Sequence, residues 1–273
     1  MNTYLSLASF PGISHLNAIN LGCIAVKECH LKEHGFDDVL LDHVQICPQN
    51  SEVFDLDMAG YFVESFPNIQ FRLHANVRVD FKRFILDVSD FDWNDDNFNY
   101  WKTLASISKL LKAKVYTLHA GHFKDQLSHQ QLFKKIKQIE DLFECDVGIE
   151  GHYPLLNNQS KQMFYLSTWD EYRELFEYSD CKYVIDLSHF NIIAHKTGCY
   201  DLELLRQMME HPRCLEIHVS SNDGTKDSHK KLKNKYWWYP VLKSTKTTAI
   251  IFSEGNHLDC FSKAELQKNN EYF

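Results

Sequence analysis

Short apolar runs alternate with longer segments of helical period along almost the whole chain. The apolar runs around Tyr4–Ser9 and Val39–Ile46 have the character of buried strands. Six further strand-like segments follow, and each ends on or near a histidine or a carboxylate: FRLHANV, VYTLHAGH, VGIEGHY, YVIDLSHF, LEIHVSSND and AIIFSEGN. The pattern therefore predicts eight strands.

Between these strands, apolar residues recur at the three- and four-residue spacing of amphipathic helices. This spacing predicts helices over Phe98–Leu111, Leu132–Phe143 and Leu202–Met209. The pair Ser167–Thr168, followed by acidic residues, is typical of another helix start. A strand that alternates with a helix throughout predicts a parallel sheet.

The regular spacing of the polar strand ends favours closure of this sheet into a barrel. His74, His119, Glu150, Asp186, His218 and Glu254 succeed one another at intervals of 31 to 45 residues, the length of one βα unit in a (β/α)8 barrel. The 273 residues slightly exceed the roughly 250 of a typical barrel, and no Pro/Gly/Ser-rich linker divides them. We therefore expect a single TIM barrel over residues 1–273. A Gly-x-Gly-x-x-Gly loop is absent, which argues against a Rossmann domain.

The net charge and the cysteine content indicate which partners to expect and which cellular compartment the protein occupies. The formal net charge of −8 argues against nucleic acid as a partner. Eight cysteines without a Cys-x-x-Cys pair indicate a reduced, cytoplasmic protein. The N-terminus lacks the features of a signal peptide, and no run reaches the ~18 apolar residues of a membrane span.

Carboxylates and histidines are among the residues least expected in buried parallel strands. Several buried carboxylates together require a cation or protons to neutralise them. Glu150, Asp186, His218 and Glu254 form a quartet from four strands that suits Mn²⁺ or Fe²⁺ and tolerates Zn²⁺. The sequence therefore predicts a metalloenzyme.

Further donors suggest more than one ion. His74, His119 and His189 stand at levels equivalent to the quartet, and Asp227-Ser228-His229 follows the seventh strand. In an extended segment, Asp227 and His229 would point to the same side. Together with the quartet these nine residues exceed what one ion needs, and bridging carboxylates would let them hold two or three. Asp227 and Glu254 are also the predicted catalytic residues.

Other polar residues flank this set. His122, His152, His195 and His257 are candidates for proton transfer or for supporting the ligands, or else are solvated loop histidines. The basic and aromatic stretch Lys226–Lys246 predicts a solvated helix start with its aromatic residues packed under the barrel rim. Binding of nucleic acid or of an acidic peptide leader stays open there. The acidic residues Asp87, Asp90, Asp92, Asp95 and Asp96 predict a solvated loop and a helix cap.

The quartet resembles the metal site of the xylose-isomerase-like sugar isomerases and epimerases. The fuller set resembles the multinuclear branch of that superfamily, which includes endonuclease IV. The segments DLSHFNIIAHKTG, EIHVSSNDGTKDSH and SEGN resemble multinuclear iron enzymes that modify ribosomally made peptides, among them the methanobactin-forming oxidases. The resemblance spans roughly Phe71 to Asn256.

This resemblance implies a non-haem iron oxidoreductase that uses O2 to oxidise a cysteine of a precursor peptide. The implied centre holds two or three mixed-valent iron ions, and the product of the methanobactin type is an oxazolone with a thioamide. A smaller leader-binding protein, in a heterodimer, is the implied partner. Two alternatives stay open. One is a sugar or sugar-phosphate isomerase with a single divalent ion, in which Glu150 and Glu254 act as acid and base; the other is an endonuclease IV-like phosphodiesterase with three zinc ions.

Overall fold

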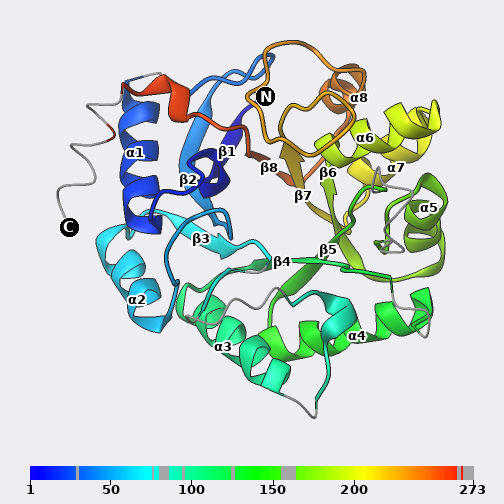
Figure 1. Ribbon diagram of the computed structural model, residues 1–273, viewed down its shortest axis with the longest axis horizontal. Helices are drawn as coiled ribbons and strands as arrows, with labels where there is room; N and C mark the ends of the chain where they lie inside the picture. Colours follow the sequence, from blue (N-terminus) through cyan, green and yellow to red (C-terminus); the bar gives the residue numbers. More distant parts are fainter. Residues whose placement is uncertain are drawn as a thin grey trace.

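The computed structural model describes residues 1–28, 31–75, 77–79, 86–93, 96–123, 127–154, 164–262 and 266. Eight strands form one sheet of parallel pairs in the order β3-β2-β1-β8-β7-β6-β5-β4. An isolated parallel bridge between His74 and Thr117, with a 2.8 Å hydrogen bond from the Ala75 amide to the Thr117 carbonyl, brings β3 beside β4. The sheet is thereby a nearly closed (β/α)8 barrel (Figure 1), as the sequence predicts.

All eight expected strands are present, with bounds close to those that the apolar runs predict. They are β1 (Thr3–Ser6), β2 (Val39–Ile46), β3 (Gln70–Leu73), β4 (Val115–His119), β5 (Asp146–Glu150), β6 (Lys182–Asp186), β7 (Cys214–Val219) and β8 (Ile250–Ser253). Because every pair is parallel, the carboxyl ends of all the strands lie at one end of the barrel.

The helices pack around the outside of this barrel (Figure 1). They are α1 (His15–Lys27), α2 (Leu56–Ser65), α3 (Asp96–Leu110), α4 (His129–Phe143), α5 (Trp169–Tyr178), α6 (Leu187–Thr197), α7 (Leu202–Glu210) and α8 (Tyr239–Ser244), with short 3-10 turns at Leu7–Ser9, Val88–Asp90 and Leu258–Cys260. The sequence predicted α3, α4, α5 and α7, and it predicted a helix start within Lys226–Lys246, where α8 lies; it did not predict α1, α2 or α6.

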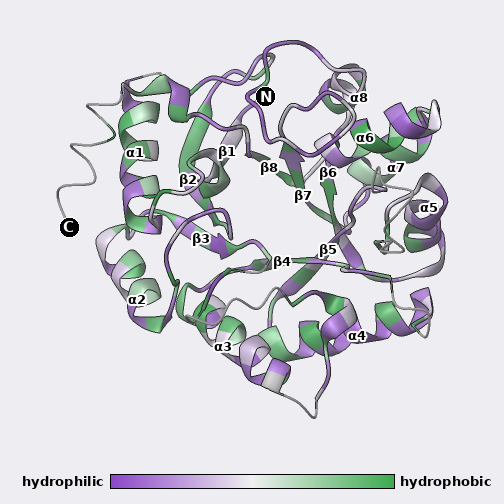
Figure 2. Cartoon of the chain, in the orientation of Figure 1, coloured by the Kyte–Doolittle hydropathy of each residue, from purple (hydrophilic) through white to green (hydrophobic). Residues whose placement is uncertain are grey.

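Local sequence explains both outcomes. In α4 a capping box at Ser128 begins the helix, and Leu132, Ile136 and Ile139 form a buried stripe. Figure 2 shows both hydrophilic (purple) and hydrophobic (green) residues along this helix. In α1 the apolar pattern is interrupted by Gly22. A Cβ atom there would come within 2.4 Å of Leu5 Cδ2, so this glycine allows the helix to lie close to β1.

Of two predictions about solvated segments, the one for the acidic residues is partly wrong. Asp87 is a buried helix cap with 5% of its surface exposed, whereas Asp92 is exposed as predicted; Asp95 and the Asp96 side chain lie outside what is described. In Lys226–Lys246, Trp238 and Tyr239 are buried at the rim, which agrees with aromatic packing there. No helix in the described part of the chain has both the length and the apolar character needed to cross a bilayer.

Candidate metal centre

The nine predicted ligands lie together at the carboxyl ends of the strands. Their positions follow from the fold: His74 directly after β3, His119 and Glu150 at the last residues of β4 and β5, Asp186 at the last residue of β6, His189 in the first turn of α6, His218 in β7, Asp227 and His229 in the loop after β7, and Glu254 directly after β8. Eight of them line a pocket of about 240 Å³, and the ninth, His218, is fully buried against Glu150 and Glu254.

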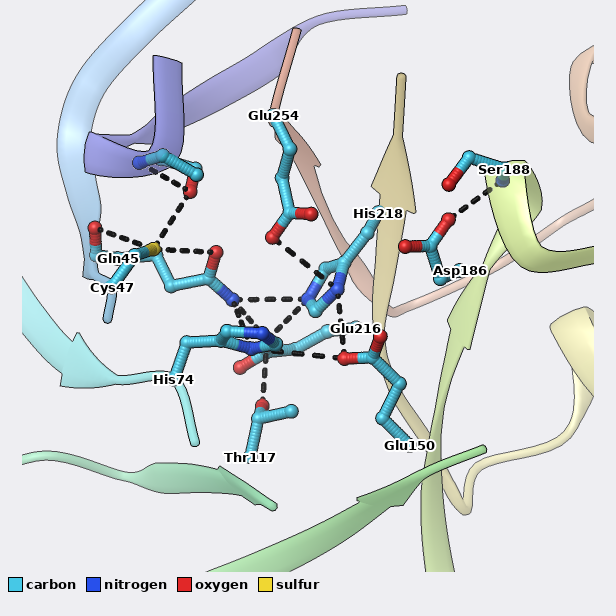
Figure 3. A network of polar contacts seen from close by, with 12 residues as sticks. Gln45, Cys47, His74, Thr117, Glu150, Asp186, Ser188, Glu216, His218 and Glu254 are labelled. Atoms are coloured by element: carbon cyan, nitrogen blue, oxygen red, sulfur yellow. Dashed lines mark hydrogen bonds and ion pairs between the residues drawn. The ribbon is translucent and has the colours of Figure 1, made fainter. Parts of the chain in front are cut away.

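Strand register aligns these side chains. His119 pairs with Glu150 across β4 and β5, and Asp186 pairs with His218 across β6 and β7. In adjacent parallel strands, paired residues point to the same face, so each pair enters the barrel mouth side by side. Figure 3 shows Glu150, His218 and Glu254 pointing toward one another from three strands.

His218 and Glu150 form one half of the centre. The Nδ1 atom of His218 lies 3.2 Å from Glu150 Oε2 and 3.4 Å from Glu254 Oε1. Glu150 Oε2 also lies 3.7 Å from His74 Nδ1 and 3.9 Å from His119 Nε2. One carboxylate oxygen thus lies within 4 Å of three imidazoles.

Asp227 organises the other half. Its Oδ2 atom lies 2.7 Å from His229 Nε2 and 3.4 Å from His189 Nε2. His189 Nε2 is 3.5 Å from Asp186 Oδ2, and His229 Nδ1 is 3.7 Å from Glu254 Oε2. Glu254 therefore faces both halves, through His218 and through His229.

The start of α6 brings His189 into the site. Asp186 ends β6 and is also the N-cap of α6, where its Oδ1 accepts hydrogen bonds from the amides of Ser188 at 2.6 Å and His189 at 3.3 Å. The sequence-based interpretation ran YVIDLSHF together as one strand end, which missed this helix. The three-residue spacing of Asp186 and His189 places both on one face of its first turn.

The Asp227–His229 pair reaches the pocket by a different route from the one predicted. His229 has a φ of 40°, so the segment is not simply extended. Left-handed backbone is uncommon outside glycine, although histidine is among the residues that adopt it more often. The bend, rather than strand alternation, directs the His229 ring toward Asp227 and Glu254.

Unpaired polar atoms test whether the residues fit a metal. Glu150 Oε2, His218 Nδ1, Glu254 Oε1 and His229 Nδ1 are buried and make no hydrogen bond among the described residues. Buried polar atoms without partners are costly and rare. These four belong to the predicted ligands and point at one another over distances too long or too poorly aligned for hydrogen bonds, so they fit cations well.

Three groups of three possible ligand atoms, each with all its atoms within 4.8 Å, occur in this set: His74/Glu150/His218, Glu150/Asp186/His189 and Asp186/His218/Glu254. Glu150, Asp186 and His218 each occur in two of these groups. A fourth group joins Asp87 and His119 to His152. The structure therefore offers places for more than one ion.

Electrostatics show how much the site lacks a positive charge. Burial raises the pKa of Glu254 to about 7, although His218 and His229 oppose the shift. Burial lowers the pKa of His189, but Asp186 and Asp227 outweigh it and raise that pKa to about 10. Without a cation, histidines must be protonated to balance the carboxylates.

A second polar cluster lies directly beneath. Glu216 precedes His218 by two residues on β7 and accepts hydrogen bonds from Arg72 Nη1 at 2.7 Å, Thr117 Oγ1 at 2.9 Å and Gln45 Nε2 at 3.0 Å. Its Oε2 also lies 3.0 Å from His218 Nε2. We call Gln45, Arg72, Thr117 and Glu216 the Glu216 cluster. It holds one nitrogen of His218 and leaves Nδ1 for the site (Figure 3).

The sequence-based interpretation overlooked this cluster, although Glu216 is a charged residue in a buried strand and alternates with His218 in LEIHV. Of the four flanking histidines, only His152 lines the pocket, where burial lowers its pKa well below the usual value. His122 stacks on Phe164, His195 is exposed, and His257 pairs with Glu33 at 2.8 Å. Gln49 and Tyr153 also line the pocket and carry no sequence signal.

Comparisons with known proteins bear on the fold. No family model matches the chain, and no curated protein matches it. Among solved structures it is similar to the IolI protein with a bound zinc atom, at 13% identity and a TM-score of 0.62 over 100% of this chain and 99% of the other. It is also similar to a xylose isomerase domain containing protein from Salmonella typhimurium, at 12% identity and a TM-score of 0.58 over 98% and 94% of the two chains.

A third similarity is to an AP endonuclease of family 2 from Brucella melitensis, at 12% identity and a TM-score of 0.59 over 100% and 99% of the two chains. At these identities the likeness shows a common fold. None of the three similarities bears on the oxidation of a peptide cysteine, which stays a prediction. The chain therefore has the TIM-barrel fold of xylose-isomerase-like and AP endonuclease proteins.

Proposed function

We propose that this chain is a multinuclear metalloenzyme that hydrolyses a phosphodiester bond. The observation that carries the proposal is the convergence of nine ligand-type side chains, eight of which line one pocket. Four of their buried atoms make no hydrogen bond among the described residues. A one-ion isomerase would leave His74, His119, Asp227 and His229 without a task. Similarity to an AP endonuclease over the whole chain supports this choice.

When bound, two or three divalent ions would stabilise the negative charge that develops on a phosphodiester and activate water. Glu150 and Asp186, which recur between the groups, would bridge the ions. Asp227 would hold His189 and His229, whose ring nitrogens lie 3.4 and 2.7 Å from its Oδ2. The Glu216 cluster would keep His218 Nδ1 directed at the ions.

Oxidation of a peptide cysteine at two or three irons is the second candidate. Its support is the donor set, because nitrogen and oxygen donors surround the pocket and no cysteine of the described residues lines it. A soft sulfur ligand would therefore come from a substrate. The cysteine-containing peptide, O2 and the smaller leader-binding partner stay parts of this hypothesis.

A sugar isomerase with a single metal ion is the third candidate function. Its support is the small pocket of about 240 Å³ together with the similarity to a xylose isomerase domain containing protein. Glu150 and Glu254, both beside His218, would be its acid and base.

Metal analysis and turnover separate the three. We expect two or three ions per chain, anomalous peaks within about 4 Å of one another, and metal-dependent hydrolysis of bis(p-nitrophenyl) phosphate. A single anomalous peak in a fully loaded crystal would overturn the multinuclear site and favour the isomerase. Iron as the native metal, without phosphodiesterase activity in any metal form, would instead favour peptide oxidation.

A further inference from the structure

Outside the metal centre, a second group of reactive side chains surrounds Cys260. The Cys260 thiol lies 3.3 Å from Lys231 Nζ and 3.9 Å from His257 Nδ1. His257 is fully buried, and its other ring nitrogen, Nε2, lies 2.8 Å from Glu33 Oε1. The order carboxylate, imidazole, thiol is that of an activated cysteine.

Glu33 is fixed from several sides. It is buried, Ser253 Oγ donates to its Oε1 at 2.7 Å, and the Leu232 amide donates to its Oε2 at 2.8 Å. Gly255 makes room for it, since a Cβ there would lie 2.7 Å from Glu33 Oε1. The His257 ring is therefore oriented by a rigid buried carboxylate, and its Nδ1 is turned toward sulfur.

A pocket of about 420 Å³ adjoins this group, lined in part by Lys230, Lys231 and Lys233. Leu258 and Asp259, which directly precede Cys260 in the chain, also line it. The lysines make the pocket suited to an anionic ligand, although Asp259 Oδ1 lies 3.8 Å from the sulfur and opposes them in part.

We propose that Cys260 is a reactive thiol that exchanges with small anionic disulfides and forms a mixed disulfide beside this pocket. The Cys260 thiolate attacks one sulfur of the disulfide, the new sulfur–sulfur bond forms as the old one breaks, and the other half leaves as a thiolate. The small disulfide is itself the oxidant, so no further reactant is needed. This site is separate from the proposed hydrolysis.

The electrostatics agree with the geometry. His257, followed by Lys231, lowers the pKa of the Cys260 thiol below its usual value despite partial burial. Most other cysteines that are buried or half-buried show the reverse: burial raises the pKa of Cys145 to about 11 and also raises that of Cys181. Cys199 is exposed and provides an internal reference for accessibility alone.

The test is the rate of mixed-disulfide formation at each cysteine. The reduced full-length protein is treated with limiting glutathione disulfide at slightly acidic pH, and each site is quantified by peptide mass spectrometry. We expect Cys260 to react first, ahead of the more exposed Cys199. Faster reaction at Cys199 would overturn the proposal.

Variants identify the cause of the reactivity. Lys231→Met should slow the reaction at Cys260 by roughly threefold or more, and more with a dianionic aromatic disulfide than with neutral iodoacetamide. Lys243→Met, at the exposed end of α8, is the matched control. His257→Asn should slow it as well, with thermal unfolding used to verify the fold. Unchanged rates in both Lys231→Met and a folded His257→Asn would refute the activated thiol.

Discussion

Two buried polar clusters lie one above the other in this barrel, and they differ in how well they are satisfied. In the Glu216 cluster a single carboxylate is contacted by Arg72, Thr117, Gln45 and His218, all at 2.7–3.0 Å. In the candidate metal centre above it, Glu150, His218 and Glu254 each carry a buried atom with no hydrogen bond among the described residues.

The two clusters share His218, whose Nε2 faces Glu216 and whose Nδ1 faces Glu150 and Glu254. The lower side is satisfied by hydrogen bonds within the protein, whereas the upper side leaves His218 Nδ1 without a hydrogen bond among the described residues. The sequence alone does not distinguish the two clusters, because in both of them carboxylates and other polar residues lie in or next to buried strands. The two clusters therefore differ in whether their buried polar atoms have hydrogen-bond partners.

The largest effect should come from removing a bridging carboxylate. We expect Glu150→Ala to lose at least one ion per chain and to reduce turnover more than about hundredfold, since even residues that only support ligands contribute 10- to 100-fold. Elemental analysis and activity assays measure this. Asp146→Ala, at the exposed opposite end of β5, is the control and should keep both. Full metal content in Glu150→Ala would refute the site.

Breaking the lower cluster should affect stability whether or not metal is present. Arg72→Met leaves the fully buried Glu216 without its cation and should lower the free energy of unfolding by about 3–5 kcal/mol. Denaturant unfolding in chelator measures this loss, and the loss with metal should be at least as large. The double variant Arg72→Met/Glu216→Gln should recover part of it. A decrease in the free energy of unfolding below about 1 kcal/mol would mean that the Arg72–Glu216 ion pair does not stabilise the fold as proposed.

Metal binding should reverse the effect of one substitution at the upper cluster. Glu254 is a buried carboxylate whose pKa burial raises to about 7. In chelator, Glu254→Gln should therefore be at least as stable as the wild type. With metal at about 100 times its Kd, the wild type should gain about 2.7 kcal/mol, and the variant should gain much less. Equal gains in thermal or denaturant unfolding would remove Glu254 from the ligands.

The smallest effect concerns a histidine away from both clusters. His15 is 1% exposed, and burial lowers its pKa to about 4, below the unfolded value of 6.5. The unfolded state therefore binds the proton more readily, and stability falls as pH drops through 6.5 toward 4.

Between about pH 7 and pH 5 this one group should cost the fold about 2 kcal/mol. His15→Leu should remove that share of the acid sensitivity, measured as the difference between wild type and variant in urea unfolding at both pH values. An identical pH dependence in the two proteins would contradict the buried neutral histidine.

Much of the fold could be read from local pattern. Each apolar strand run is a pattern of neighbouring residues, and the spacing of 31 to 45 residues between polar strand ends is a repeat along the chain. Both can be recognised without the tertiary structure, and together they predicted the barrel. Helix α6 was missed because Asp186 serves at once as strand end and N-cap, so no turn separates the elements. Helix α1 was missed because Gly22 weakens its pattern, and its role appears only when β1 lies against it.

The sequence by itself determined the eight strands, the ligand types at their ends and their order along the chain. Only the tertiary structure decided which of these polar atoms are satisfied. Glu216 meets Gln45 across 171 residues of sequence, and His257 meets Glu33 across 224. Such pairs depend on strand register and on loop paths such as the bend at His229. Local periodicity carries no information about either, because it fixes the face of a strand and not the partner opposite it.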